Sequence, residues 1–397
     1  MKIVVISNLH YAKTNPPAAP YEQGRNADIF LLRTVHRINR WIKPDAVIIG
    51  GTVTDQPDDA DAMAELKPYL EKLEMPLLLN GAITVEDHCF SMDAALDDSS
   101  KKIVRVDNQP DGVTLSTADG WSVKAPDLCR APFRYMIVTF GTKTAVQPEE
   151  LALPDGYFDS HIHTRFAYCQ ENLDPFRQLE LTKLFNLERF AFTEHSGHLY
   201  ATSQDYGNKT LQRNGLANTF RQDRAKDYLA MLDELEQKGS FIRGFELDVD
   251  RSGDIIVLPE DLARVNLKVG AVHWLDAGDD REAQKQDFLF RTEKLLAAGC
   301  HVLAHPFRIF GWSHPPVPTE LFEPVMRLLK QYGAAAEVNF HYNSPEPEFF
   351  RMCLENGVKI AFGSDTHNLY ELGEFYANIR FLEQIGGTKD DLFRFGD

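Results

Sequence analysis

The sequence predicts an α/β protein in which a parallel (β/α)7 barrel follows a smaller layered α/β domain. Three observations support this prediction. The chain has 397 residues, which is more than one ordinary hydrophobic core accommodates, strand and helix patterns alternate in both halves, and a polar stretch separates them. We therefore expect two domains, residues 1–150 and 151–397, although one large barrel with a smaller unit also fits the length.

The N-terminal half begins with alternating strand and helix patterns. Apolar residues recur at helical spacing at Ile29, Leu32, Val35 and Ile38, between two short apolar runs that are typical of buried strands. The expected elements are a strand over Lys2–Ser7, a helix over Asn26–Lys43, a strand over Asp45–Gly50, a second helix, and a strand over Pro76–Asn80.

The pattern then changes to short β-like runs between Ser99 and Gly141. The segments Asn-Gln-Pro-Asp-Gly and Ala-Asp-Gly separate these runs and are typical of hairpins and turns. The stretch from Gln147 to Gly156 is rich in proline and acidic residues, and we interpret it as the linker between the domains.

Seven strand candidates alternate with helix candidates in the C-terminal half. Strands that alternate with helices predict right-handed βαβ units, and seven such units in succession predict a parallel barrel. The expected strands are Tyr157–His163, Arg189–His195, Phe241–Val249, Leu267–His273, His301–His305, Ala334–Asn339 and Lys359–Asp365.

Composition narrows the class of protein. A net charge of −17 disfavours general nucleic-acid binding, because affinity for polyanions comes mainly from clustered lysine and arginine. No apolar run approaches the roughly 20 residues that a membrane span needs, and the N-terminus lacks the features of a signal peptide. The five cysteines form no Cys-x-x-Cys pair, so we expect a cytoplasmic protein without disulfides.

Almost every predicted barrel strand ends in a side chain that can bind a metal ion. The carboxyl ends of parallel barrel strands converge on one face, where such enzymes build their active sites. Neutral imidazole and carboxylate together suit zinc, manganese or iron, and the number of these groups predicts a cluster of two or three divalent ions. The residues are His161, His163, His195, Glu246, His273, His305, Asp365 and His367.

Spacing supports a shared site. His161 and His163 lie two residues apart on a strand, so both side chains point to the same side, and Asp365 and His367 repeat that spacing. The alternative is that each histidine is an independent strand-end residue held by backbone hydrogen bonds, which does not explain six at corresponding positions. We expect His301 to be packed, and the loop residues His198 and His314 to lie at the surface or on the substrate side.

These motifs resemble the polymerase-and-histidinol-phosphatase (PHP) superfamily. The resemblance covers nearly all of residues 157–390, in the order found in that family. It is carried by Asp159-Ser-His-Ile-His-Thr, Phe192-Thr-Glu-His195, Gly244-Phe-Glu246, Val272-His273-Trp, Ala304-His305-Pro and Gly363-Ser-Asp-Thr-His367.

The resemblance implies a distorted barrel that holds up to three metal ions. It assigns His161, His163, Glu246 and Asp365 to the first ion, and it makes Glu246 the bridge to a second ion held by His273 and His305. His195 and His367 would belong to a third ion. Where many members have a further histidine, this chain has Cys169, so either the Cys169 thiolate or Glu171 would complete the third site.

The N-terminal part resembles the calcineurin-like metallophosphoesterases in an eroded form. Asn8 stands where an aspartate ligand is expected, Gly51 or Thr52 stands at the bridging aspartate, and Ala82-Ile83 replaces Asn-His. A neutral group cannot replace the carboxylate that holds two cations together. We therefore expect a degenerate, inactive domain; the alternative is an unrelated α/β domain.

The function that we predict is metal-dependent phosphoester hydrolysis through a metal-bridging hydroxide, on a small phosphomonoester of the histidinol-phosphate type. A phosphodiesterase or exonuclease acting on nucleotides or single-stranded nucleic acid is the first alternative, and a non-catalytic metal-stabilised module is the second. Lys209, Arg213 and Arg224, in and after the long loop that follows the second strand, are candidates for a substrate lid. Glu246, Asp365, His367, Arg165 and Arg308 are the predicted catalytic residues; the two arginines would bind phosphate, or else lie on the surface or pair with carboxylates.

Overall fold

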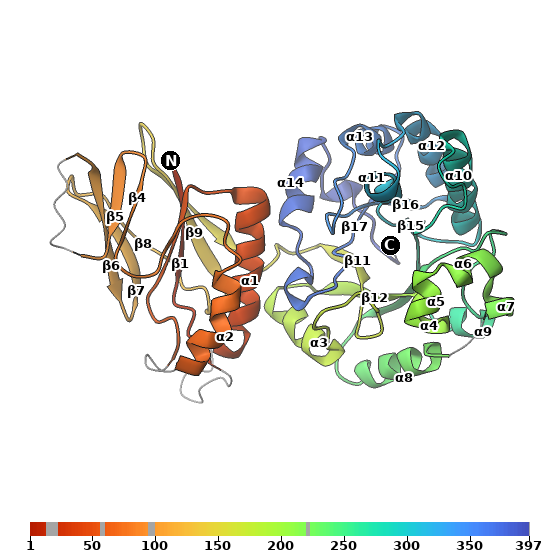
Figure 1. The fold of residues 1–397 in the computed structure, drawn as a ribbon, viewed down its shortest axis with the longest axis horizontal. Coiled ribbons are helices and arrows are strands. Elements are labelled where there is room, and N and C mark those ends of the chain that lie inside the picture. Colours follow the sequence, from red (N-terminus) through yellow and green to blue (C-terminus); the bar gives the residue numbers. More distant parts are fainter. Residues whose placement is uncertain (13–22, 56–59, 94–99, 220–222, 397) are drawn as a thin grey trace. The chain divides into compact units, whose positions relative to one another are not determined.

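The chain divides into two compact units, Met1–Ala152 and Leu153–Asp397. The computed structural model (Figure 1) describes residues 1–12, 23–55, 60–93, 100–219 and 223–396. The sequence-predicted β region that starts at Ser99 thus begins just outside the described residues.

The N-terminal unit contains a mixed five-stranded sheet in the order β10-β9-β1-β2-β3. β1, β2 and β3 run parallel, whereas β9 is antiparallel to β1 and to β10. The strands are β1 (Lys2–Ser7), β2 (Ala46–Gly50), β3 (Leu77–Leu78), β9 (Arg134–Thr139) and β10 (Ala145–Glu150), and the helical segments are η1 (Gly24–Asn26), α1 (Ala27–Arg37), the π-helical turn η2 (Ile38–Ile42) and α2 (Ala60–Leu70).

A second five-stranded sheet of this unit has the order β4-β5-β6-β7-β8. Apolar residues of both sheets, among them Ile3, Ile48, Phe90 and Val104, form one buried cluster, so the sheets share a core. The strands are β4 (Ala82–Val85), β5 (His88–Ser91), β6 (Lys102–Gln109), β7 (Gly112–Thr117) and β8 (Ser122–Lys124).

The first part of the stretch that the sequence suggested as a linker is a strand, so that interpretation was wrong for residues 147–150, whereas the boundary between the two units lies within the rest of the stretch. Ala145–Glu150 forms β10, which pairs along its whole length with β9. Pro148 is tolerated there because β10 is the edge strand, so its missing N–H breaks no interior ladder. The local sequence resembles a linker because the strand is exposed and acidic.

The C-terminal unit contains a closed barrel in which seven parallel strands follow the sequence order from β11 to β17. Pairing of Asp159 with Phe362 joins β11 to β17 and closes it. All seven predicted strands are confirmed, with ends shorter by up to three residues. They are β11 (Phe158–Ile162), β12 (Arg189–His195), β13 (Ile242–Leu247), β14 (Leu267–Gly270), β15 (Val302–Leu303), β16 (Ala335–Val338) and β17 (Ile360–Phe362).

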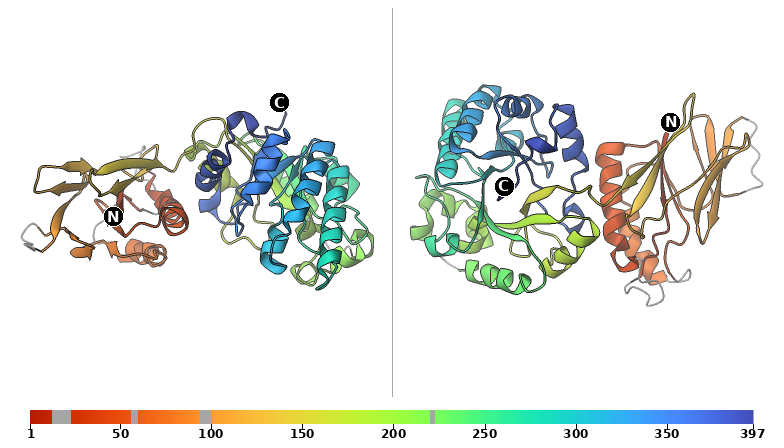
Figure 2. Two further views of the ribbon diagram at one scale, coloured as in Figure 1. Left: turned by 90° about the horizontal axis from the view of Figure 1, so that it is seen from above. Right: turned by 180° about the vertical axis from the view of Figure 1, so that it is seen from behind.

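Helices surround these strands as an outer ring (Figures 1 and 2). Capping side chains start several of them: Asp174 accepts a hydrogen bond from the N–H of Arg177 before α3, and Asp280 does the same for α10. The helical segments are α3 (Pro175–Leu184), α4 (Ser196–Tyr200), α5 (Ser203–Gly207), α6 (Thr210–Asn214), α7 (Leu216–Thr219), α8 (Ala225–Leu235), α9 (Pro259–Leu262), α10 (Arg281–Ala297), α11 (Arg308–Ser313), η3 (Thr319–Leu321), α12 (Phe322–Tyr332), α13 (Pro347–Glu355), η4 (Leu369–Glu371), α14 (Tyr376–Gln384) and η5 (Lys389–Asp391).

The amino ends of the barrel strands form an apolar layer. Small side chains such as Ala191 and Ala361 lie in this layer with Phe158, and Phe393 and Phe395 of the C-terminal tail pack against it. Apolar side chains fill this end of the barrel. The buried polar residues of the barrel are therefore concentrated at the carboxyl ends of the strands.

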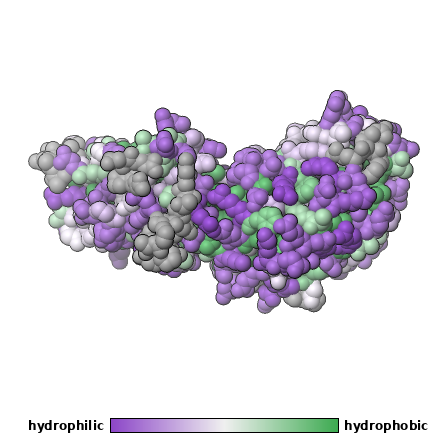
Figure 3. All heavy atoms as spheres, turned by 90° about the horizontal axis from the view of Figure 1, so that it is seen from below, coloured by the Kyte–Doolittle hydropathy of each residue, from purple (hydrophilic) through white to green (hydrophobic). Residues whose placement is uncertain are grey.

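The surface on the face shown in Figure 3 is mostly hydrophilic, with hydrophobic atoms in small groups. Among the described residues, no helix combines the length and the apolar character that crossing a bilayer requires.

Candidate metal centre

The eight metal-binding candidates at the strand ends lie together at the carboxyl end of the barrel. β11 contributes His161 and His163, β12 ends at His195, and β13 carries Glu246. The remaining side chains come from the segments that follow β14, β15 and β17. All eight side chains are almost fully buried, and the most exposed of them is His273, at 13%. The barrel therefore brings together the set that the sequence predicted.

Four side chains form the first group. The Nε2 atoms of His161 and His163 lie 3.1 Å apart. His161 Nε2 lies 3.4 Å from Glu246 Oε1, and His163 Nε2 lies 3.7 Å from Glu246 Oε2. Asp365 Oδ1 lies 3.6 Å from His161 Nε2 and 3.0 Å from His163 Nε2. Tetrahedral ligands with metal bonds of about 2.1 Å lie about 3.4 Å from one another, so these spacings fit one ion.

The second group is centred on the same Glu246 carboxylate. Its Oε1 atom lies 3.3 Å from His273 Nε2 and 3.0 Å from His305 Nε2. The guanidinium of Arg308 also lies here, with Nη2 2.6 Å from His305 Nε2 and Nη1 2.5 Å from Asp365 Oδ2. Arg308 thus takes the carboxylate-paired arrangement and places a positive charge beside the candidate ligands.

A third group contains Cys169. Its Sγ lies 2.9 Å from His367 Nε2 and 3.7 Å from His195 Nε2, so it is close to both imidazoles. The Glu171 carboxylate instead accepts a hydrogen bond of 2.6 Å from the Asn368 side chain. Of the two residues that could complete a third site, Cys169 is therefore the one that contacts both imidazoles.

Acceptor groups orient the rings of four candidate ligands through Nδ1. Because each Nδ1 faces an oxygen that accepts, it carries the hydrogen, and the lone pair of Nε2 faces the cluster. The pairs are His161 with Glu337 at 2.8 Å, His163 with Glu194 at 3.3 Å, His273 with Asp248 at 2.7 Å, and His367 with the Asp365 carbonyl oxygen at 2.7 Å.

Sequence reasoning missed the orienting acids Glu337 and Asp248. One signal was available for Glu337, because the strand Ala334–Asn339 was the one predicted barrel strand to which no functional side chain had been assigned. Asp248 lies directly beyond β13 and gave no comparable signal.

The acids at the centre stay ionised although they are buried. Burial raises the pKa of Glu246, but the imidazoles of His195, His273 and His161 lower it well below its usual value. Burial likewise raises the pKa of Asp365, and His161 and Arg308 hold it well below the usual range. Buried carboxylates that remain charged need nearby cations, which bound metal ions can supply.

Among the residues that the structure describes, two buried polar atoms of the cluster form an ion pair with each other but make no hydrogen bond. His195 Nδ1 and Glu246 Oε2 face each other without the geometry of a hydrogen bond. Buried oxygen atoms without a hydrogen bond are rare, and a cation would satisfy Glu246 Oε2 because it binds lone pairs directly. The donor set therefore fits divalent metal ions.

Two of the candidate ligands have strained backbone conformations. His305 and Asp365 have positive φ angles of 29° and 52°, in the left-handed region that side chains rarely adopt. Such conformations persist where surrounding contacts determine them, and they cluster at functional sites.

A pocket of about 440 Å³ opens over the cluster, which is the size of site that holds a small ligand. Besides candidate ligands it presents several aromatic side chains and the cations Lys209 and Arg308. Its lining residues are Tyr168, Cys169, Glu171, His195, His198, Ser203, Tyr206, Gly207, Lys209, His273, Arg308, Trp312, His341, Tyr342, His367, Tyr370 and Glu371.

Arg165 is not among the residues that line this pocket, contrary to its predicted role. The chain turns directly after His163: the Thr164 hydroxyl donates to Glu194, and the carbonyl of Thr164 accepts from the N–H of Ala167. This turn leaves Arg165 exposed, with its guanidinium 5.8 Å from the Phe166 ring centre.

The other predicted histidines lie as follows. His301 is packed at the opposite end of the barrel against Phe395, and His314 contacts Gln284 outside the pocket. His198 lies on α4 rather than in a loop, is 3% exposed and lines the pocket, so it is on the substrate side.

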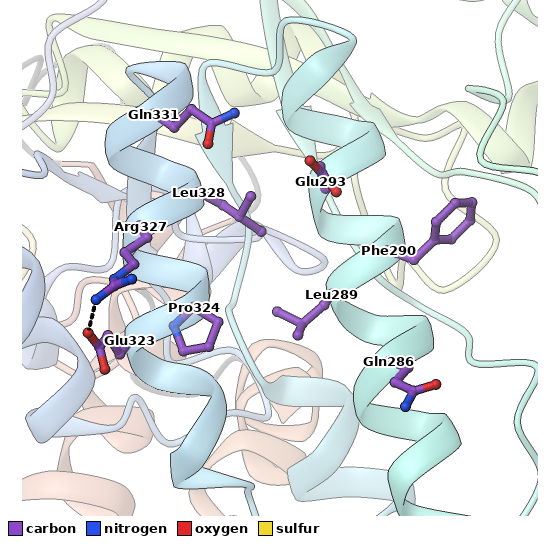
Figure 4. A pocket seen from close by; sticks show the side chains of 9 residues that line it. All are labelled: Gln286, Leu289, Phe290, Glu293, Glu323, Pro324, Arg327, Leu328 and Gln331. Atoms are coloured by element: carbon purple, nitrogen blue, oxygen red, sulfur yellow. Dashed lines mark hydrogen bonds and ion pairs between the residues drawn. The ribbon is translucent and has the colours of Figure 1, made fainter.

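A larger hollow of about 620 Å³ lies between α10 and α12 on the outside of the barrel (Figure 4). Leu289 and Leu328 point into it, and the Glu323 and Arg327 side chains pair with each other at one side. Its lining residues include two glutamates but no histidine, cysteine or aspartate, so the smaller pocket is the candidate active site.

The eroded motif of the N-terminal unit surrounds a polar hollow of about 470 Å³. Asn8 accepts a hydrogen bond of 3.0 Å from the N–H of Thr52 and donates one of 2.5 Å to Asp127, so its amide links two loops. His10 Nδ1 lies 2.8 Å from Asp55. Amide and hydroxyl groups stand where the resemblance expected anionic ligands.

Comparison with known proteins relates about half of the chain to phosphatases by name. A protein of Acetivibrio thermocellus named "Probable phosphatase" is 27% identical over 222 residues, which are 51% of this chain and 87% of that protein. One of Thermoanaerobacter sp. with the same description is 23% identical over 226 residues, 51% of this chain and 88% of that protein.

A solved structure from Listeria monocytogenes, described as a "putative histidinol phosphatase", aligns with a TM-score of 0.40 and 15% identity, over 56% of this chain and 99% of that one. No family model matches the chain.

We predict that Gly363→Ala weakens metal binding. A Cβ atom at this position would lie 1.8 Å from Glu337 Oε1 and 2.8 Å from His161 Cβ, so Glu337 must move away from the ring that it orients. Loss of such an orienting contact lowers metal affinity about 10- to 100-fold.

Competition with a chelator, followed by elemental analysis, measures the effect. Gly141→Ala is the matched control, because a Cβ there meets nothing closer than 3.7 Å. Unchanged metal affinity in a folded Gly363→Ala variant would show that Glu337 has no part in the site.

Proposed function

We propose that this chain is a metal-dependent phosphatase that hydrolyses a small phosphomonoester at the carboxyl end of its C-terminal barrel. It is an enzyme that hydrolyses phosphate esters, as the names of its relatives and its set of candidate metal ligands indicate. The observation that carries the proposal is the convergence of imidazole and carboxylate groups from successive strands on the Glu246 carboxylate.

The donor set suits two or three divalent ions such as zinc, manganese or iron. His161, His163, Glu246 and Asp365 would hold one ion, and Glu246, His273 and His305 would hold a second. Cys169, His195 and His367 would hold a third. When bound, such ions polarise the phosphoryl group and make water nucleophilic near neutral pH.

The chain itself would bind and orient the phosphate. Arg308 lines the pocket and presents a planar guanidinium, which can bind two phosphate oxygens at once. Its hydrogen bond to Asp365 holds the side chain in position before substrate binds. Burial of the cluster excludes bulk water and strengthens each electrostatic interaction with the phosphate.

The shape of the pocket favours a small substrate. Its volume of about 440 Å³ suits a compact phosphorylated molecule. Trp312 and Tyr342, which are 56% and 68% exposed, line it and offer ring faces for a flat substrate group. A histidinol-phosphate-type monoester fits these features, whereas a net charge of −17 disfavours a polynucleotide.

The N-terminal unit would not take part in catalysis. We interpret it as a degenerate calcineurin-like domain in which Asn8 replaces a metal contact by hydrogen bonds to Thr52 and Asp127. Its two sheets and shared core suit a structural or regulatory role.

The central test combines a substrate panel with two variants. Purified protein is assayed on phosphomonoesters, bisphosphonucleotides and single-stranded oligonucleotides, with metal content measured in parallel. We expect hydrolysis of a small monoester, and we expect Glu246→Gln and Asp365→Asn to lose at least one ion and several orders of magnitude in rate, because each removes a charge that holds cations.

Glu323→Gln, an exposed change on α12, is the control and should retain both metal and activity. Circular dichroism checks that the barrel survives, since its core is made of apolar residues away from the cluster. Full activity and full metal content in Glu246→Gln would mean that the site is elsewhere.

A second prediction concerns Cys169. If its thiolate binds a metal ion, alkylating reagents should modify it slowly until a chelator removes the ion. Without metal, burial and the nearby carboxylates of Glu194 and Asp365 raise the pKa of this thiol, so labelling is best compared at alkaline pH. Equal labelling rates with and without chelator would assign the position to Glu171 or water.

A third prediction tests the N-terminal unit. His10→Ala should leave metal content and hydrolysis almost unchanged, because His10 contacts Asp55 and the expected carboxylate ligands around it are missing. A fragment of residues 1–150 that bound metal and cleaved a phosphodiester would contradict this interpretation.

A further inference from the structure

His198 is a buried histidine of the pocket with no assigned role. It lies on α4, directly after β12, and it is 3% exposed. Its ring lines the pocket, and one of its nitrogen atoms lies within 4.8 Å of donor atoms of Cys169 and His195. Position alone would allow it to be a further metal ligand.

The hydrogen bonding of His198 differs from that of the candidate ligands. Its Nδ1 lies 3.1 Å from the backbone nitrogen of Tyr168, which donates its hydrogen. Nδ1 must therefore present its lone pair, and the single hydrogen of the neutral ring is on Nε2. In His161 and His273, by contrast, Nδ1 faces a carboxylate, and Nε2 has the lone pair that a metal ion needs.

The contacts of the ring hold it in this orientation. The ring centre of Tyr168 lies 4.9 Å from that of His198, and the Tyr206 ring packs edge-on at 4.2 Å. Gly197 makes room for this packing, since a Cβ there would lie 2.6 Å from the Tyr206 ring. Arg224 donates to the His198 carbonyl and lies over the Tyr168 ring, which connects the two segments.

The Nε2 atom of His198 has no hydrogen-bond partner among the residues that the structure describes. An N–H group on a buried ring that lines a pocket requires an acceptor, and it repels a cation. A ligand that binds in the pocket can supply this acceptor. A phosphate whose other oxygens lie on the metal cluster would present an oxygen close to this side of the pocket.

We propose that His198 is a neutral hydrogen-bond donor that binds a non-bridging phosphate oxygen of the substrate through Nε2–H, and that it is not a metal ligand. This inference rests on the proposed phosphatase function and adds a residue that selects the phosphate group. In this arrangement, α4 and the segment around Tyr168 hold the Nε2–H of His198 at the edge of the metal cluster.

The test uses zinc-loaded full-length protein and inorganic phosphate as the probe. His198→Phe removes the donor, and His198→Gln keeps an N–H near the position of Nε2. We expect the dissociation constant of inorganic phosphate, measured by calorimetry, to rise about tenfold or more in His198→Phe and to recover largely in His198→Gln. Zinc content should be unchanged in both variants.

His301→Phe is the matched control, because His301 Nδ1 also accepts a backbone hydrogen bond of 3.1 Å, from Lys268, outside the pocket. It should leave phosphate affinity unchanged. Nitrogen-15 NMR of labelled histidines in the unmutated protein should show His198 as the Nε2–H tautomer, and this holds whether or not the variants fold.

The outcomes separate this inference from the proposed function. Loss of zinc from His198→Phe, an Nδ1–H tautomer, or unchanged phosphate affinity would overturn the role of His198 while hydrolysis by the unmutated protein still supported the phosphatase. Protein that binds phosphate through His198 but hydrolyses no phosphate ester would support the donor and overturn the proposed function.

Discussion

The buried carboxylate of Glu246 is the group around which the other candidate metal ligands are arranged. It is 1% exposed, and imidazoles from four different strands or strand ends surround it, among them His161 at 3.4 Å and His305 at 3.0 Å. A buried carboxylate that stays charged is costly unless positive or polar groups compensate it. Closure of the barrel provides that compensation, because it brings the strand ends together around one point.

A second layer of acids determines what the histidines can do. Glu337 and Asp248 accept from Nδ1 of His161 and His273, which fixes the side of each ring that carries the lone pair. The same side chain type behaves differently in His198, where a backbone N–H takes the place of the acid. The orientation of each ring thus determines its suitable ligand. His161 and His273 present a lone pair that suits a cation, whereas His198 presents an N–H that suits an anion.

The two ends of the barrel are specialised in opposite ways. At the amino ends, Phe393 and Phe395 cover a layer of small apolar residues and provide stability. At the carboxyl ends, charge is buried and the backbone is strained, as the positive φ angle of Asp365 illustrates. Stability from the first end supports the strain and charge at the second, which is a common division in parallel barrels.

The sequence by itself determined the seven barrel strands and the ligand-bearing positions at their ends, because strand periodicity and chain order suffice to place those ends on one face. Tertiary structure alone decided the rest. β10 is a strand because it pairs with the preceding strand β9, which its exposed, acidic sequence did not indicate, and Arg165 is exposed because a local turn redirects its side chain. The roles of Glu337 and His198 depend on which ring nitrogen faces which atom, a relation between segments far apart in the chain that no local pattern encodes.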